Sequence, residues 1–323
     1  MEIIYNISNK YDIMDLLSIV VPCYNEEESV EIFLREIQKV LKDRSFEVIF
    51  INDGSADDTL KKIKDLADEN ANVNYISFSR NFGKEAAIYA GLNYAKGDMV
   101  CLMDADLQHP PSMLPQMISA IEEENYDVAA ARRITRKGEP KIKSFFSHRY
   151  YRFFNRISKI EIVEGGTDYR VMTRQVVDAI LQLEEYNRFT KGLFQWVGFE
   201  TKWIEYENVE RAAGETTWSF LGLIAYSIEG IVAFSTMPLT LAIIIGTIVS
   251  IVAFGYMIFI IAKYLLYSDP VQGFATTMCA ILLLGGLQLL FIGTLGKYLE
   301  KTYFETKNRP IFIVKETNIK DSD

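Results

Sequence analysis

Short apolar runs alternate with helically spaced apolar positions along the first part of the chain. Residues 17–22 form a mostly apolar run that ends in proline, which predicts a buried strand. Residues 29–41 carry apolar side chains three and four positions apart, which predicts a helix. The same alternation predicts strands at 47–51, 73–77 and 99–103 and helices at 57–69, 84–95 and 111–123. This order predicts an α/β fold, with a mainly parallel sheet covered by helices on both faces.

Two long runs without a charged residue follow, at residues 231–262 and 271–296. A helix needs about 20 apolar residues to cross a bilayer. We therefore predict a hairpin of two transmembrane helices over residues 235–298, with spans at about 239–264 and 271–297. The alternative is a pair of helices buried in a soluble core, which would normally each keep a polar face.

Basic residues follow the second predicted span, and by the positive-inside rule they place that end in the cytoplasm. Two spans return the rest of the chain to the same side, so both termini are expected in the cytoplasm of a cell-membrane protein. The predicted divisions are an N-terminal extension (1–15), a cytoplasmic α/β domain (16–217), an interfacial segment (218–234), the hairpin (235–298) and a cytoplasmic tail (299–323).

Composition narrows the function classes. The 323 residues are 49% hydrophobic and 24% charged, as expected of a folded protein. A net charge of −9 argues against a nucleic-acid partner. Cys23, Cys101 and Cys279 are too widely spaced for a disulfide framework or a zinc site, which favours reduced, packed thiols. The first 15 residues lack the pattern of a signal peptide.

Polar side chains follow three predicted strands directly. Tyr24 and Glu26 follow the first strand, Asp53 follows the second, and Asp104 and Asp106 follow the fourth. Ligands of such sheets bind at the carboxyl ends of the strands, so these side chains are expected to converge on one crevice. Asp53 and Glu26 have a second interpretation, as helix N-cap or turn residues.

The pair Asp104 and Asp106 predicts a site for a hard divalent cation. Mg²⁺ is usually held by one or two carboxylates together with phosphate oxygens and waters, and Gln108 offers a further oxygen. Such an Asp-x-Asp pair can also arise by chance as two solvated acids. Its place after a strand, beside two other polar loops, favours the metal site.

Four segments together resemble the family-2 glycosyltransferases: residues 19–26 (IVVPCYNE), 52–55 (NDGS), 81–84 (NFGK) and 103–111 (MDADLQHPP). Within that family the chain is similar to the branch of dolichol-phosphate mannose synthase and the bacterial polyprenyl-phosphate glycosyltransferases, over residues 16–310. The resemblance implies a GT-A-type, Rossmann-like fold. It also implies an inverting enzyme that moves one hexose from a nucleotide-sugar to a polyprenyl phosphate at the cytoplasmic membrane face, for cell-envelope glycan modification.

The resemblance also implies roles for residues at matching positions. The nucleoside would be held by Pro22, Tyr24, Glu26, Ile51 and Asp53. The diphosphate would be met by Asp104, Ala105 and Asp106, with Mg²⁺ or Mn²⁺ at Asp104, Asp106 and Gln108. Arg132 would lie near phosphate, Arg211 would lie on a loop that closes over the donor, and Asp168 would lie near the reaction centre, as a general base or as an ordering group.

One departure from the family pattern concerns phosphate binding. The family usually has Gly-Glu-Ser-Lys where this chain has Gly-Glu-Thr-Thr at residues 214–217, so a lysine is missing at Thr217. Lys84 or Arg211 is expected to supply the positive charge, which makes Lys84 a further donor-site candidate.

Residues 137–159 are basic and aromatic, and a helix at about 141–159 is expected to lie in the membrane interface. The alternative is an ordinary amphipathic helix packed on the domain. Because a lipid phosphate must reach the metal crevice, Lys143 and Ser147, with Arg132, are the candidates for binding the acceptor phosphate.

Three questions stay open. UDP-glucose is the favoured donor, with UDP-N-acetylglucosamine and UDP-galactose close behind. A processive polysaccharide synthase is disfavoured by the two predicted spans and by the absence of a Gln-x-x-Arg-Trp motif, and a catalytically idle scaffold by the intact Asp104 and Asp106. Glycines at 285, 286, 293 and 296 permit close helix approach, so a homo-oligomer is expected to be feasible.

Overall fold

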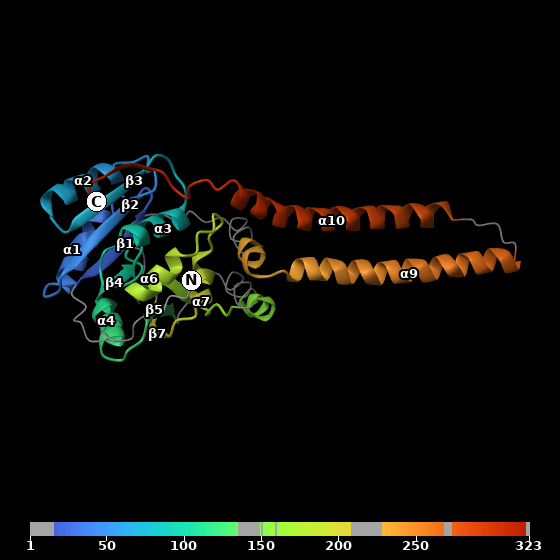
Figure 1. Ribbon diagram of the computed structural model, residues 1–323, viewed down its shortest axis with the longest axis horizontal. Coiled ribbons are helices and arrows are strands. Elements are labelled where there is room, and N and C mark those ends of the chain that lie inside the picture. The colour runs from blue at the N-terminus through green and yellow to red at the C-terminus, as the bar shows by residue number, and fades with distance from the viewer. Residues whose placement is uncertain are drawn as a thin grey trace, which may run out of the picture.

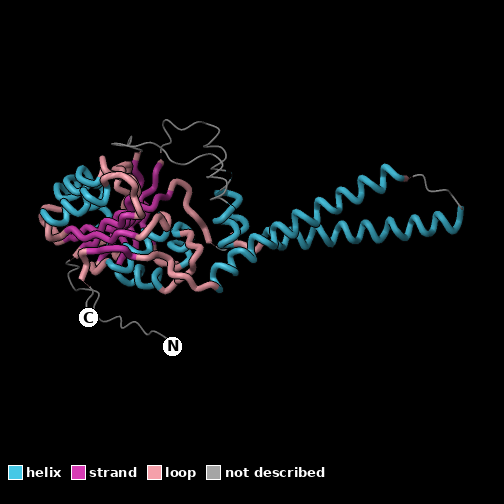
Figure 2. Tube along the Cα trace, turned by 90° about the horizontal axis from the view of Figure 1, so that it is seen from above, coloured by secondary structure: helices cyan, strands magenta, loops and turns pink. Residues whose placement is uncertain are grey.

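The computed structural model describes residues 16–134, 149, 151–158, 160–207, 228–267 and 273–320. They form an α/β domain from which two long helices project side by side (Figures 1 and 2). Lys143, Ser147, Arg211 and Thr217 lie outside the described residues, as does the extension 1–15. Of the two predicted interfacial segments, residues 151–157 and 228–234 are described, and both are helical.

One eight-stranded sheet forms the centre of the domain, in the order β7-β5-β6-β4-β1-β2-β3-β8. The strands are β1 (Leu17–Cys23), β2 (Phe46–Asn52), β3 (Val73–Phe78), β4 (Met99–Leu102), β5 (Val128–Arg133), β6 (Gly166–Thr173), β7 (Thr201–Tyr206) and β8 (Val314–Thr317). Strands β4, β1, β2 and β3 pair in parallel, as do β5 and β7. Strands β6 and β8 run antiparallel to their neighbours. The predicted mainly parallel sheet is therefore confirmed.

Helices cover both faces of the sheet (Figure 1). They are α1 (Val30–Val40), α2 (Thr59–Glu69), α3 (Lys84–Tyr94), α4 (Leu114–Glu122), α6 (Arg174–Leu181) and α7 (Thr190–Trp196), with a 3₁₀ turn at Pro111–Met113 before α4. One buried cluster joins α1, α2 and α4 to one face, and a second joins α3 and α6 to the other. Ile19 belongs to the first cluster and Val20 to the second, which explains why this strand reads as a continuous apolar run.

The edge strand β8 comes from the tail, where no strand was predicted. It pairs antiparallel with β3, and the Phe312 ring stacks on Phe78 with 5.1 Å between centroids. The Lys64 ammonium lies 2.6 Å from a carboxylate oxygen of Glu316 on β8. Strand β8 therefore completes the sheet of the α/β domain. A four-residue strand is too short to show a period in the sequence.

The two projecting helices are α9 (Met237–Tyr267) and α10 (Phe274–Thr306). Apolar side chains of α9 point outward, among them Ile243, Ile251 and Phe254, which are 69%, 67% and 60% exposed. Among the described residues, one helical stretch, Met237–Lys263, is long and apolar enough to cross a membrane. The second span, and with it the predicted transmembrane hairpin, stays a prediction.

Candidate active site

The sheet brings its polar loops to one edge. Strands β4, β1 and β2 are parallel neighbours, so their carboxyl ends lie together, and these ends carry the loops with Asp104, Tyr24 and Asp53. Strand β6 runs the opposite way, with Arg170 opposite Leu102, so it begins where β4 ends. The start of β6, which holds Asp168, therefore lies beside the Asp104 loop.

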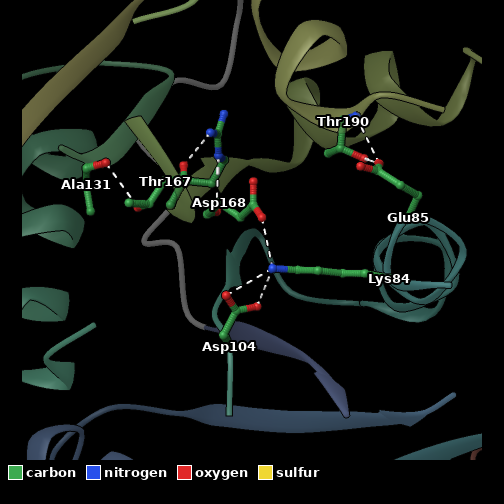
Figure 3. Close-up of polar contacts among 8 residues, drawn as sticks. Lys84, Glu85, Asp104, Ala131, Thr167, Asp168 and Thr190 are labelled. Carbon is green, nitrogen blue, oxygen red and sulfur yellow. Dashed lines mark hydrogen bonds and ion pairs between the residues drawn. The ribbon is translucent and has the colours of Figure 1, made fainter. Parts of the chain in front are cut away.

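Lys84 joins two of these acidic groups. Its Nζ lies 2.7 and 3.0 Å from Oδ1 and Oδ2 of Asp104 and 2.9 Å from Oδ2 of Asp168 (Figure 3). Desolvation in the crevice lowers the pKa of the Lys84 ammonium, but the carboxylates of Asp104 and Asp168 outweigh it, so this pKa is raised. Lys84 is thus a permanently charged bridge between the β4 loop and the start of β6.

The Asp168 carboxylate is held ionised. Burial alone would raise its pKa, but the positive charges of Lys84, Lys191 and Arg170 bring the pKa of Asp168 well below its usual range. Arg170 is buried, stacks its guanidinium 3.5 Å from the centroid of the Phe194 ring, and donates hydrogen bonds to the carbonyls of Thr167 and Asp168. A carboxylate with a depressed pKa is a poor general base, and whether Asp168 acts as a base or as an ordering group stays a prediction.

Asp53 fixes the loop that carries Lys84. Its Oδ1 accepts a hydrogen bond from the Phe82 amide at 2.6 Å, and its Oδ2 accepts one from the Gly83 amide at 2.9 Å. Burial raises the pKa of Asp53, and these two hydrogen bonds oppose the rise. Asp53 therefore has a structural role, because it binds the backbone of the loop before α3. Its contact with a nucleoside stays a prediction.

Gly54 allows this close approach of two loops. Its φ is +66°, and a Cβ placed there would lie 2.5 Å from the carbonyl carbon of Arg80 and from the amide nitrogen of Asn81. Only glycine combines this backbone conformation with this contact.

The loops after β1 and β2 are hydrogen-bonded together. The Asn25 amide donates to Oγ of Ser55, and the Glu26 amide donates to Oγ1 of Thr59. Tyr24 is 48% exposed at this edge. Pro22 and Ile51 are also predicted to hold the nucleoside, and they lie opposite each other on β1 and β2. The predicted nucleoside residues therefore occupy two adjacent strand ends.

The Asp104–Gln108 loop turns sharply. Asp106 Oδ1 accepts a hydrogen bond from the Gln108 amide at 3.1 Å, and Leu107 has a φ of 55°. Ala105 is buried, whereas Asp104, Asp106 and Gln108 are partly exposed. The loop thus anchors itself through Ala105 and leaves three oxygen-bearing side chains within reach of solvent.

The side chains of the Asp104–Gln108 loop suit a divalent cation that is bound by the protein and a phosphate ligand together. In the described part of the chain, no three His, Cys, Asp or Glu side chains are grouped to hold a metal ion. Asp104 and Asp106 instead offer two carboxylates, which matches Mg²⁺-type ions that take one or two carboxylates and complete their shell with phosphate oxygens and water. The donor set therefore fits a divalent ion that arrives with a diphosphate.

His109 and Tyr206 form a pair that the sequence did not reveal as part of the site. The Tyr206 hydroxyl lies 2.7 Å from Nδ1 of His109, whose ring stacks on Tyr169 with 5.6 Å between centroids. Burial lowers the pKa of His109, while the nearby charges of Asp104 and Asp106 oppose this. Through these contacts the loop after β4 is held against β6 and β7. The contacts depend on the order of distant strands in the sheet, so no local sequence pattern predicts them.

Arg132 lies at the end of β5, on the same edge, and has other partners. Its Nε donates to the carbonyl of Glu164 at 3.1 Å, and its guanidinium lies 3.6 Å from a carboxylate oxygen of Glu205. The contacts described for Arg132 do not include Asp104 or Asp168. The structure brings Lys84, Asp104 and Asp168 together, whereas Arg132 lies at the end of β5 with Glu164 and Glu205 as its partners.

Glu85 links the site to α7. Its carboxylate accepts hydrogen bonds from both the amide and the hydroxyl of Thr190 (Figure 3). Lys84 and Glu85 thus point to different partners from the first turn of α3. Glu85 and Thr190 were absent from the sequence-based candidates.

Comparisons with known proteins agree with the sequence motifs. A family model described as glycosyl transferase family 2 matches residues 18–181. An uncharacterized glycosyltransferase of Synechocystis sp. is 39% identical over 93% of this chain and 95% of its own length. A prophage bactoprenol glucosyl transferase homolog of Escherichia coli is 40% identical, covering 93% of this chain and 98% of its own. The bactoprenol glucosyl transferase of Shigella phage SfII is 40% identical, covering 94% and 98%.

Proposed function

Because the chain belongs to glycosyl transferase family 2, we propose that it transfers a hexose from a nucleotide-sugar to a polyprenyl phosphate at the cytoplasmic face of the membrane. The observation that carries the proposal is the group of Lys84, Asp104 and Asp168 at the edge where the strand-end loops meet. The acceptor class is supported by relatives named bactoprenol glucosyl transferases that align over nearly the whole chain.

The nucleoside of the donor would lie at the ends of β1 and β2. Tyr24 offers an exposed ring for stacking on a base, and Asp53 retains lone pairs beside the two amide hydrogen bonds that it accepts. The diphosphate would then extend toward Asp104 and Asp106. We favour UDP-glucose as the donor.

A divalent ion, Mg²⁺ or Mn²⁺, would be held by Asp104 and Asp106 with Gln108, and when bound it would neutralise charge on the diphosphate. Lys84 bridges two carboxylates and can donate to a phosphate oxygen from the same position. It would supply the positive charge that the family lysine, replaced by Thr217, provides in other members.

The reaction we propose is one in-line displacement. A lipid-phosphate oxygen attacks the anomeric carbon, the bond from that carbon to the UDP oxygen breaks, and UDP leaves with the electron pair, with inversion. A phosphate monoester is already ionised at neutral pH, so no base is required. Asp168 would hold Lys84 in place, and positioning of the two substrates would supply much of the rate.

The apolar helices support the proposed membrane location. Met237–Lys263 has the length and composition of a span, and α10 lies beside it. We propose that both helices cross the bilayer and that the domain and both termini face the cytoplasm, with residues 151–157 and 228–234 near the interface.

The test is a transfer assay with purified full-length protein. Protein, Mg²⁺ or Mn²⁺ and undecaprenyl phosphate are incubated with UDP-glucose, UDP-N-acetylglucosamine, UDP-galactose or GDP-mannose, and the lipid product is identified by mass. We expect one glucosyl phospholipid that forms only with metal present. Activity of Asp106→Ala equal to wild type would reject the metal site, and failure of every donor would reject the transfer reaction.

A further inference from the structure

One side of helix α7 packs against the candidate active site. The amide and the hydroxyl of Thr190 both donate to the carboxylate of Glu85, which follows Lys84 in the first turn of α3 (Figure 3). The centroid of the Phe194 ring lies 3.5 Å from Cζ of Arg170 on β6. These two contacts hold α7 against the start of α3 and against β6, the elements that supply Lys84 and Asp168.

Lys191 lies on this same side of α7. Successive residues of a helix are about 100° apart around its axis, so Phe194 lies between Thr190 and Lys191, about 60° from Lys191. The charge of Lys191 acts on Asp168. Burial raises the pKa of Asp168, and the positive charges of Lys84 and Lys191 more than reverse that rise. Helix α7 therefore brings a second ammonium group to the neighbourhood of Asp168.

Lys191 differs from the other cations near Asp168 because it has no direct partner in the described part of the chain. Lys84 pairs with two carboxylates, and Arg170 donates to two backbone carbonyls. No described residue forms a hydrogen bond or an ion pair with the partly exposed Lys191 side chain. The carboxylate on which its charge acts, that of Asp168, is already paired with Lys84 at 2.9 Å. The three N–H donors of Lys191 are thus not used by the described part of the site.

The other side of α7 faces the segment that leads into the proposed span. Gly192 and Trp196 lie about 40° apart around the helix axis, and each is at least about 100° from Lys191. A Cβ at Gly192 would lie 2.3 Å from Cε2 of Phe234, so the helix at 228–234 packs directly on α7, three residues before α9 begins. Trp196 is 59% exposed, and exposed tryptophan is typical of the membrane–water interface. Helix α7 therefore lies between the site and the membrane side of the domain.

We propose that Lys191 binds the phosphate group of the polyprenyl acceptor. This inference deepens the proposed function and rests on it. The donor diphosphate would meet the Asp104–Gln108 loop and Lys84, which leaves Lys191 for the second substrate. A lysine ammonium is a compact charge with three donors, which suits a phosphate monoester. Because α7 has the membrane side of the domain behind it, Lys191 would hold a lipid phosphate that arrives from that side, with one of its oxygens free to attack.

The first test is steady-state transfer by the purified full-length protein, with undecaprenyl phosphate and the nucleotide-sugar varied in turn. We expect Lys191→Met to raise the KM for undecaprenyl phosphate about tenfold, because one charged hydrogen bond to the acceptor is lost. The KM for the nucleotide-sugar should stay within about twofold. Lys191→Arg keeps the charge and should recover part of the acceptor affinity. The matched control is Lys202→Met, since Lys202 lies at the start of β7 and pairs with Glu124, and both KM values should be unchanged.

An acceptor KM in Lys191→Met equal to that of wild type would overturn the assignment of Lys191 and leave the transfer reaction intact. A rise in the nucleotide-sugar KM as large as the rise in the acceptor KM would also overturn it, because Lys191 would then not be specific to the acceptor.

Reductive methylation of the wild-type protein tests the contact without turnover and without a substitution. Undecaprenyl phosphate should protect Lys191 from methylation, as measured by the mass of its peptide, whereas undecaprenol and inorganic phosphate should not. Lys202 should be methylated equally in all samples. Absence of protection by undecaprenyl phosphate, or equal protection by undecaprenol or by inorganic phosphate, would overturn the proposal. Protection of Lys191 in a protein that transfers no sugar would reject the proposed reaction while keeping the binding site.

Discussion

At the scale of single residues, Lys84 is the group on which the site depends most. It forms ion pairs with both Asp104 and Asp168, and in the proposed reaction it would also meet the departing diphosphate. We expect Lys84→Met to lower kcat about 10²–10³-fold, the usual cost of losing one preorganised donor to developing charge. Lys84→Arg should recover part of the activity. Steady-state transfer with Tm as a folding control measures this, and a kcat of Lys84→Met within threefold of wild type would contradict it.

The pKa shifts of Lys84 and Asp168 predict the pH dependence of the site. The pKa of Asp168 is lowered, so its stabilising contribution is present at neutral pH and is lost only as pH falls through that low value. The pKa of Lys84 is raised, so its contribution persists until pH rises through that high value. We therefore expect neither group to titrate in the kcat profile between about pH 6 and 9. Lys84 is one of the charges that lower the pKa of Asp168. In Lys84→Met that pKa should rise, so the loss of kcat on the acidic side of the pH profile should begin at higher pH.

Gly54 gives a test of backbone geometry. Gly54→Ala must place a Cβ 2.5 Å from backbone atoms of Arg80 and Asn81 at a φ of +66°. Gly83 has a φ of +96° but nothing within 4 Å of the added atom, so Gly83→Ala is the matched control. We expect Gly83→Ala to lower unfolding free energy by about 1 kcal/mol and Gly54→Ala by at least twice that. Equal losses in denaturant melts would argue against the clash.

The positions of the acidic loops could be predicted from sequence, but their partners could not. Asp104 and Asp53 follow recognisable strands, and parallel strands bring their ends together. The bridge from Lys84 to Asp168 depends on β6 entering the sheet antiparallel beside β4, which no local pattern records. The carboxylate of Asp53 accepts hydrogen bonds from the Phe82 and Gly83 amides. This contact joins two loops about 30 residues apart in the sequence, so no local pattern predicts it.

At the scale of elements, β8 is the part that binds the end of the chain to the domain. Phe312, just before it, packs on Phe78, whereas its neighbour Ile313 is 51% exposed. We expect Phe312→Ala to cost about 2 kcal/mol of unfolding free energy, below the value for a fully buried phenylalanine. Ile313→Ala should cost less than about 0.5 kcal/mol. Comparable losses for the two variants would mean that Phe312 does not anchor the strand.

The sequence predicted the strands and helices whose apolar pattern extends over several residues. It did not predict a strand that forms only because it pairs with a distant strand. The first four strands and the helices between them have clear apolar patterns, and their observed ends lie close to the predicted ones. By contrast, β8 spans Val314–Thr317 and carries Lys315 and Glu316, so its strand character comes from the open edge of β3 that it covers.

At the scale of the whole molecule, α9 should hold the protein in the bilayer. Ile251 lies midway along α9 and is 67% exposed. An arginine at the centre of a span costs about 2.5–3.5 kcal/mol in insertion. We expect Ile251→Arg to reduce the fraction that resists alkaline carbonate extraction from membranes, with Ile251→Ala as the control. Unchanged extraction of Ile251→Arg would show that α9 is not embedded.

The position of β8 sets an order on biosynthesis. A ribosome makes the chain from its first residue, so β8 emerges only after both long helices have been made. Until then, among the described residues, no strand pairs with the edge of β3 that β8 later covers. If the helices enter the bilayer during translation, the domain reaches its finished form only once it is already tethered there. Newly made chains would then complete their sheet beside the bilayer, where the proposed lipid acceptor lies.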